Sequence, residues 1–255
     1  MDRWRGKSAV VTGAFSGIGA AVSSALLSNG INVTGLDIQK GGFAPVPDST
    51  SRDSKFGKFF HISCDLSKER DILSAFERIA EERAGVDILV NNAGVIDYKR
   101  IIESDRETYE KLVNLNILGV ASCTREAVRS MRSRNVEGHI FNINSVVGHE
   151  IPERAFSDSI EKNGFNLYPA TKHATVAMTH SLRREIMAAK LPIRITSLSP
   201  GLVKTNIATA AGFPELFEEI LALKPEDIAD GLIYALGTRP EVQVTELTIR
   251  RTGEP

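Results

Sequence analysis

The 255-residue sequence predicts an α/β fold in which a doubly wound parallel sheet of about seven strands carries helices on both faces. Short apolar runs alternate with longer amphipathic stretches along the chain, which is the pattern of βαβ units. Hydrophobic residues make up 42% of the chain, enough to bury a substantial core. We find neither an internal repeat nor a linker, so we expect one domain over residues 1–255.

Seven short apolar runs have the length of strands. In chain order they are residues 8–12, 32–37, 58–64, 86–91, 139–145, 193–199 and 242–249. Helices are expected between them at residues 17–29, 68–83, 106–133, 168–189 and 225–237. Two segments interrupt this alternation and are expected to be loops: 40–57, rich in Gly, Pro and Ser, and the charged insertion 151–164. The second lies where a lid over a site can form.

The charges nearly balance, with 31 Lys and Arg against 32 Asp and Glu, so no excess attracts nucleic acid or an anionic membrane. No apolar run approaches the roughly 20 residues that span a bilayer. The polar residues 1–7 lack the anatomy of a signal peptide. Cys64 and Cys123 show no CxxC or His-rich spacing, so we interpret them as packing residues. We therefore expect a cytoplasmic, metal-free protein whose partners are small molecules.

The first predicted strand runs directly into the segment TGAFSGIG at 12–19, and a helix follows. Glycines let the backbone turn tightly and approach a pyrophosphate, and they let the helix aim its first amides at the anion. An ordinary strand-to-helix turn is the alternative, but the position favours a Rossmann-type dinucleotide site. The expected cofactor contacts are Gly13, Phe15, Ser16, Gly17, Ile18 and Gly19.

Asp37 closes the second predicted strand, where a carboxylate can accept hydrogen bonds from a ribose diol. A 2′-phosphate at this point would meet a like charge. Neither Ser16 nor the residues Ile38 and Gln39 supplies a compensating cation. The sequence therefore favours NAD over NADP, although Asp37 can also be a residue that merely terminates a strand.

Three further segments follow predicted strands at the carboxyl edge of the sheet, where ligands of open α/β folds gather. Asp65 can accept from an adenine amino group, although a helix cap by Asp65 or Ser67 is a competing role. The segment NNAG at 91–94 is expected to contact the adenosine side or support the sheet, and residues 199–205 to hold the nicotinamide carboxamide; a plain turn is the alternative for each. The expected contacts are Asp65, Leu66, Asn92, Ala93, Gly94, Pro200, Gly201, Val203 and Thr205.

Tyr168 and Lys172 stand four residues apart in a predicted helix and therefore share one face. A tyrosine with a pKa near 10 is a poor base at neutral pH, but Lys172 and the positive charge of an oxidised nicotinamide are expected to lower that pKa. Lys172 can also bind the nicotinamide ribose, so both residues are expected to contact the cofactor. Taken alone, the spacing also fits an ordinary amphipathic helix surface.

Two more polar residues give this pair a mechanism. Ser145 ends the fifth predicted strand, where its hydroxyl can donate to a substrate oxygen beside Tyr168. Asn116 lies in an otherwise apolar stretch, in which a buried amide needs partners. It can hold a water that relays protons between Lys172 and solvent, or it can be a satisfied core amide.

The order of these features resembles the short-chain dehydrogenase/reductase family over essentially the whole chain. The resemblance rests on TGxxxGIG at 12–19, NNAG at 91–94, a helical Asn, a strand-ending Ser, YxxxK at 168–172 and PG at 200–201. It implies that Asn116, Ser145, Tyr168 and Lys172 form a catalytic tetrad. It also implies a homodimer or homotetramer joined through the long helices at 106–133 and 168–189.

Four short stretches are similar to the insect farnesol dehydrogenase group: MDRW at 1–4, CTREA at 123–127, NINS at 142–145 and LKPED at 223–227. This similarity implies an apolar alcohol such as farnesol as substrate; vertebrate relatives of the group act on steroid and other carbonyls. Two features depart from it. Asp37, Ile38 and Gln39 stand where the group usually carries an Ala-Arg-Arg that recognises NADP, and the span from Ser145 to Tyr168 is longer than is common in the family.

We therefore expect hydride transfer between NAD and an alcohol or carbonyl, with NADP the less favoured cofactor. Tyr168 would act as general base toward the alcohol and as general acid toward the carbonyl, while Ser145 polarises the oxygen. A steroid, sugar alcohol or polar hydroxy acid is the alternative substrate. A non-catalytic dinucleotide sensor or scaffold is an alternative of another class, but such proteins typically lose tetrad residues and this chain keeps all four.

Overall fold

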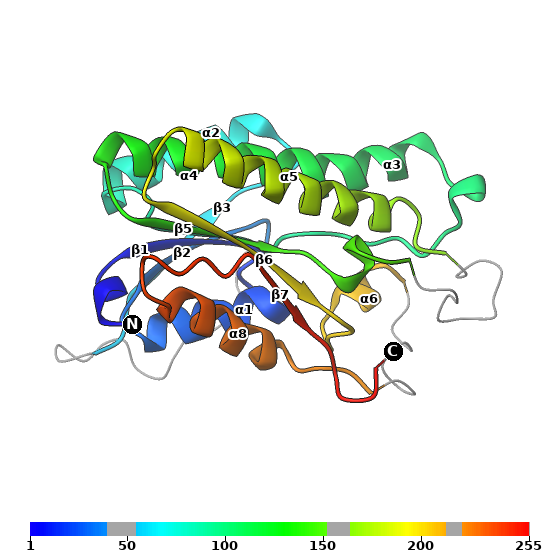
Figure 1. The fold of residues 1–255 in the computed structure, drawn as a ribbon. Coiled ribbons are helices and arrows are strands. Elements are labelled where there is room, and N and C mark those ends of the chain that lie inside the picture. The colour runs from blue at the N-terminus through cyan, green and yellow to red at the C-terminus, as the bar shows by residue number, and fades with distance from the viewer. Residues whose placement is uncertain (40–54, 152–163, 213–220, 255) are drawn as a thin grey trace.

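The computed structural model describes residues 1–39, 55–151, 164–212 and 221–254. Within these ranges, seven parallel strands form one sheet in the order β3-β2-β1-β4-β5-β6-β7 (Figure 1). This confirms the predicted fold class. The order reverses between β1 and β4, and ligands of doubly wound sheets bind at such a switch point. Most of the two expected loops, 40–57 and 151–164, lies outside the described residues.

The strands lie close to the predicted positions. They are β1 (Ser8–Thr12), β2 (Asn32–Asp37), β3 (Phe59–Ser63), β4 (Ile88–Asn91), β5 (Gly138–Ile143), β6 (Ile193–Pro200) and β7 (Glu246–Ile249). Most boundaries agree within one or two residues, and two of the differences have a clear structural cause. β5 ends at Ile143 because Ser145 already begins a short 3₁₀ turn. β7 starts at Glu246 rather than at residue 242, because the carbonyls of Val242 and Val244 accept from the side chains of Arg194 and Thr196.

The described helices are α1 (Gly17–Ser28), α2 (Glu69–Arg83), α3 (Arg106–Val113), α4 (Val120–Arg134), α5 (Tyr168–Ala188), α6 (Ile207–Ala210) and α8 (Pro225–Gly237). The single helix predicted at 106–133 is interrupted, since a π-helical segment, Asn114–Gly119, joins α3 to α4. Such segments are frequent at functional sites. The four residues of α6 are too few to show helical periodicity in the sequence.

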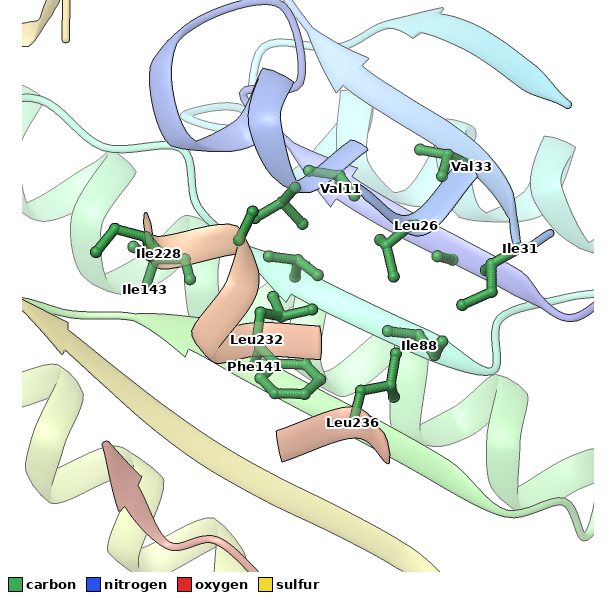
Figure 2. Close-up of a cluster of buried hydrophobic side chains, with 14 of the residues drawn as sticks. Val11, Leu26, Ile31, Val33, Ile88, Phe141, Ile143, Ile228, Leu232 and Leu236 are labelled. Carbon is green, nitrogen blue, oxygen red and sulfur yellow. The ribbon is translucent and has the colours of Figure 1, made fainter. Parts of the chain in front are cut away.

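Helices α1 and α8 cover one face of the sheet, and α2, α4 and α5 cover the other (Figure 1). Under α1 and α8, a buried cluster joins Val11, Leu26, Phe141 and Leu232 from four different elements (Figure 2). Full burial of one such side chain contributes roughly 1.5–3 kcal/mol. This face therefore anchors β1 and β5, whose carboxyl ends carry the residues of the candidate site.

Cys64 and Cys123 are free thiols that lie in the core on the α2 and α4 side, as expected for packing residues. Burial, the main cause, raises the pKa of Cys64 to about 12, which keeps the thiol protonated at neutral pH. Among the described helices, none combines the length and hydrophobicity needed to cross a bilayer.

Candidate active site

The turn between β1 and α1 forms a cradle of backbone amides. Gly13 and Gly17 adopt φ values of +64° and +50°, which side chains disfavour. A Cβ on Gly19 would stand only 2.1 Å from the carbonyl oxygen of Gly13, so only glycine permits this close approach of helix and turn. The N-cap residue Ser16 makes no side-chain capping bond within the described residues, which leaves the first amides of α1 available for an anion.

Asp37 is 7% exposed and stands beside this cradle. Its Oδ2 accepts from the amide of Phe15 at 3.1 Å and its Oδ1 from the amide of Gln39 at 3.0 Å. Each oxygen keeps a second lone pair, so the carboxylate is held as a double acceptor suited to a ribose diol. The ring of Phe15 packs edge-on against Phe59 and His61, so Phe15 reaches this region through its backbone.

Asn92 supports the glycine turn from β4. Its Nδ2 donates to the carbonyls of Thr12 at 2.9 Å and Gly13 at 3.2 Å. The hydroxyl of Thr12 accepts in return from the amides of Asn92 and Ala93 at 2.9 and 3.0 Å. The NNAG segment at 91–94 was predicted to contact the adenosine side or to support the sheet. These hydrogen bonds support the sheet edge.

Asp65 lies after β3, on the wall of the same cleft. Neither Asp65 nor Ser67 caps α2, so that expectation was wrong: the N-cap position belongs to Lys68, which makes no side-chain capping bond. Instead, Oδ1 of Asp65 accepts from the amide and hydroxyl of Ser67 at 3.1 and 2.6 Å. These bonds, the hydroxyl first, lower the pKa of Asp65. An ionised acceptor therefore faces this end of the cleft.

Lys172 is buried and its Nζ donates to the carbonyl of Ile143 at the end of β5, at 2.9 Å. The same Nζ lies 5.5 Å from the ring centroid of Tyr168. Burial lowers the pKa of Lys172 from 10.5 to about 8, since the ammonium gives up solvation. Strand β5 and helix α5 thus hold the ammonium of Lys172, whose pKa is near neutral, beside the phenol of Tyr168.

The pKa of Tyr168 differs from the prediction. Burial raises it above the ordinary value, and Tyr98 adds to this increase, while a hydrogen bond with Ser145 acts in the opposite direction. The expectation that Lys172 lowers this pKa is therefore wrong for the chain by itself. Loss of solvation is the main cause, and Lys172 is not among the groups that lower this pKa, so Tyr168 is a neutral phenol at physiological pH.

Asn116 lies in the π-helical segment and is buried. Its Oδ1 accepts from the amide of Val95 at 3.0 Å, and its Nδ2 donates to the Val95 carbonyl and to Oγ1 of Thr171 at 2.9 and 3.1 Å. Thr171 in turn donates to the carbonyl of Tyr168 at 2.7 Å. The side chain is thus a satisfied core amide that ties the NNAG segment to the first turn of α5.

The turn after β6 uses most of its own amides. Gly201 donates to Ile249 at 2.8 Å, Leu202 to a carboxylate oxygen of Glu254 at 3.1 Å, and Lys204 to the carbonyl of Leu223 at 2.8 Å. Within the described part of the chain, the amide of Val203 is the one left without a partner between residues 201 and 204. The amides of Val203 and of Thr205, which has no partner in the described ranges either, therefore stay the candidates for the predicted contact with a carboxamide.

These elements meet at a cleft of about 380 Å³ at the carboxyl edge of the sheet. The predicted residues on its wall are Gly13, Ser16, Gly17, Ile18, Asp37, Asp65, Leu66, Asn92, Ala93, Gly94, Tyr168, Lys172 and Thr205. The predicted residues that do not line it are Phe15, Gly19, Asn116, Ser145, Pro200, Gly201 and Val203. Leu36, Cys64, Leu115, Ile143 and Asn144 also line it and were not predicted. Their position at or just beyond strand ends was the available signal for four of them, Leu36, Cys64, Ile143 and Asn144.

The glycine cradle and the acceptor pair of Asp37 fit the phosphate and ribose groups of a nicotinamide dinucleotide. The amide of Val203, unpartnered within the described residues, lies behind the wall of the cleft, two residues before Thr205, and is a candidate for the carboxamide of this cofactor. In the described ranges, no three His, Cys, Asp or Glu side chains gather as a metal site requires. The fold and this cleft together define an oxidoreductase of the dinucleotide-dependent class.

Residues 7–213 match the model of the short chain dehydrogenase family, and the chain belongs to that family. It is 40% identical to a farnesol dehydrogenase of Aedes aegypti, over 100% of this chain and 99% of the relative. It is 39% identical to mouse dehydrogenase/reductase SDR family member 11, over 100% and 97%. A 3-ketoacyl-(acyl-carrier-protein) reductase from Brucella melitensis, solved with NADH, is 26% identical with a TM-score of 0.78, covering 97% of this chain and 98% of that chain. These relatives support an enzyme with a nicotinamide dinucleotide cofactor.

Proposed function

We propose that this enzyme is an NAD-dependent dehydrogenase that oxidises apolar alcohols and reduces the corresponding carbonyls. The observation that carries the proposal is the meeting of Tyr168 and Lys172 with the ribose acceptor Asp37 on one cleft. The farnesol dehydrogenase relative supports an isoprenoid or similar alcohol as substrate. Ile96, Ile207, Ala210 and Ala211 line the cleft and give it apolar wall suited to such a chain.

The residues divide the chemistry as follows. Ser145, which hydrogen-bonds Tyr168, holds the substrate oxygen. Tyr168 first loses its own proton and then, as the phenolate, takes the proton of the alcohol. The ammonium of Lys172 favours the phenolate during this transfer. Asn116 braces the start of α5 through its bond to Thr171. Bound in this cleft, the oxidised nicotinamide would supply the acceptor for the hydride.

The proposed activity is tested by following reduced-nicotinamide absorbance with NAD or NADP over a panel of farnesol, a steroid alcohol, a sugar alcohol and a polar hydroxy acid. We expect the highest kcat/KM with NAD and farnesol. Turnover with none of these alcohols, or a sugar alcohol as the best substrate, would contradict the proposal.

The cofactor preference is supported by the buried carboxylate of Asp37, which would repel a 2′-phosphate. Ile38 is 69% exposed at the end of the same strand, where an arginine has room to reach such a phosphate. We expect Asp37→Ala combined with Ile38→Arg to shift the ratio of kcat/KM toward NADP by at least about tenfold, or about 1.4 kcal/mol. A wild-type enzyme that already binds NADP more tightly than NAD would contradict the proposed preference for NAD.

We also propose a cytoplasmic enzyme that forms a homodimer or homotetramer. The two free, buried cysteines suit a reducing compartment. Leu118, in the π-helical segment, and Met187, on α5, are 54% and 72% exposed and would be covered by a second copy. Sedimentation velocity of the purified protein measures the assembly.

A further inference from the structure

The turn after β6 is held by the segment that follows β7. The amide of Gly201 donates to the carbonyl of Ile249, the last residue of β7, at 2.8 Å. In the segment beyond it, Oε1 of Glu254 accepts from the amide of Leu202 at 3.1 Å. A carboxylate is the strongest acceptor available to a backbone amide. The segment thus contributes a charged group to a turn that lies next to the cleft.

Glu254 is brought back to this turn by a reversal of the chain. Its amide donates to the carbonyl of Arg251 at 2.9 Å, and Gly253 supplies the φ of +86° that the reversal needs. Its second carboxylate oxygen, Oε2, accepts from the amide of Arg251 at 3.2 Å. Both oxygens are therefore engaged by backbone donors, which fixes the side chain in place.

The contact with the turn is close. A Cβ on Gly201 would stand 2.1 Å from Oε1 of Glu254 and 2.5 Å from Oε2. With the carboxylate in this position, a side chain at residue 201 would force Glu254 to move. The glycine of the Pro200-Gly201 pair and the carboxylate of Glu254 therefore fit each other.

The carboxylate also decides which amide remains available. With Glu254 on Leu202, and with Gly201 and Lys204 engaged by carbonyls, the amide of Val203 is left free within the described residues. Val203 lies two residues before Thr205, which lines the cleft. If Glu254 were removed, the amide of Leu202 would compete with that of Val203 and the turn would lose one of its anchors.

We propose that Glu254 is a positioning residue for the nicotinamide end of the cofactor, acting through the turn at 200–203 and the amide of Val203. The inference rests on the proposed function, in which the cleft binds a nicotinamide dinucleotide. It predicts that Glu254 affects ligands that carry a nicotinamide and leaves ligands without one unaffected. ADP-ribose provides this comparison because it contains the adenosine, pyrophosphate and ribose groups only.

The test is isothermal titration calorimetry of NADH and of ADP-ribose with the full chain. We expect Glu254→Ala to weaken NADH binding about tenfold and to change ADP-ribose binding less than twofold. Glu254→Gln keeps an acceptor and should recover most of the NADH affinity. Glu254→Asp draws the carboxylate back by one methylene and should behave like the alanine variant. The exposed Glu241, altered to Ala, removes the same charge and should match the wild type.

Melting temperatures, recorded for all variants, separate a loss of binding from a loss of folding. Equal losses for the two ligands, or no loss for NADH in the folded Glu254→Ala and Glu254→Asp variants, overturn the role of Glu254. A wild-type chain that binds NADH no more tightly than ADP-ribose overturns the proposed function itself.

Discussion

Toward its carboxyl end, strand β5 makes different kinds of contact on its two faces. On the face toward α1 and α8, Phe141 and Ile143 belong to the apolar cluster of Figure 2. On the face toward α5, Asn142 donates to Oγ1 of Thr179 at 2.8 Å and accepts from Asn91 at 2.9 Å. Close packing holds the first face, and directed hydrogen bonds hold the second. At these neighbouring positions, the ring of Phe141 serves the packing of the core and the amide of Asn142 serves the polar contacts on the side of α5.

The largest effect on stability is expected on the apolar face. Phe141→Ala removes a fully buried ring that stacks on His139 with a centroid distance of 4.0 Å. The cavity should lower the free energy of unfolding by about 3–5 kcal/mol, measured by urea denaturation. Because Phe141 points away from α5, the remaining folded enzyme should keep its kcat.

Tyr234→Ala is the matched control, since this aromatic residue of α8 is 65% exposed. It should change stability by less than about 0.5 kcal/mol. Equal losses for the two variants, or a kcat that collapses in Phe141→Ala, would break the division between the faces.

A smaller effect of opposite sign is expected on the polar face. Below pH 8, the folded chain must keep the buried ammonium of Lys172 charged, and this penalty is fully present. Between pH 8 and 10.5, the unfolded chain binds more protons than the folded one, so the wild type gains stability as pH rises. Lys172→Met should therefore be more stable than the wild type at pH 7, by at most about 3 kcal/mol, and be inactive.

Urea denaturation at pH 7, 9 and 10.5 measures this difference, which should shrink across the series. The substitution also removes the bond from Nζ to the carbonyl of Ile143, which opposes the gain. A variant less stable than the wild type at pH 7, or a difference in stability that does not change with pH, would show that the buried ammonium of Lys172 does not destabilise the fold.

The fold was predictable because its signals are local. The apolar runs gave all seven strands, and the glycine turn and the Tyr168–Lys172 spacing located the cleft from a few adjacent residues each. Asp37 was also accessible to this reasoning, since an acidic residue at a strand end has a direct chemical meaning.

Other features depend on residues that are far apart in sequence. The amide of Asn116 is satisfied by Val95 and Thr171, so no local pattern distinguishes it from an amide that binds water. The raised pKa of Tyr168 reflects burial by several elements. The contact of Glu254 with Leu202 joins residues that follow the carboxyl ends of two different strands, β6 and β7. Burial and long-range contacts are set by packing, which the sequence pattern does not encode.

We propose that Tyr168 transfers the proton in a site whose cofactor end does not depend on the Tyr168 hydroxyl. Tyr168→Phe retains the ring beside Lys172 and removes only the ionisable oxygen. We predict that kcat for the best alcohol falls about a thousandfold while the dissociation constant of NADH changes less than threefold. A kcat within tenfold of the wild-type value would contradict the account.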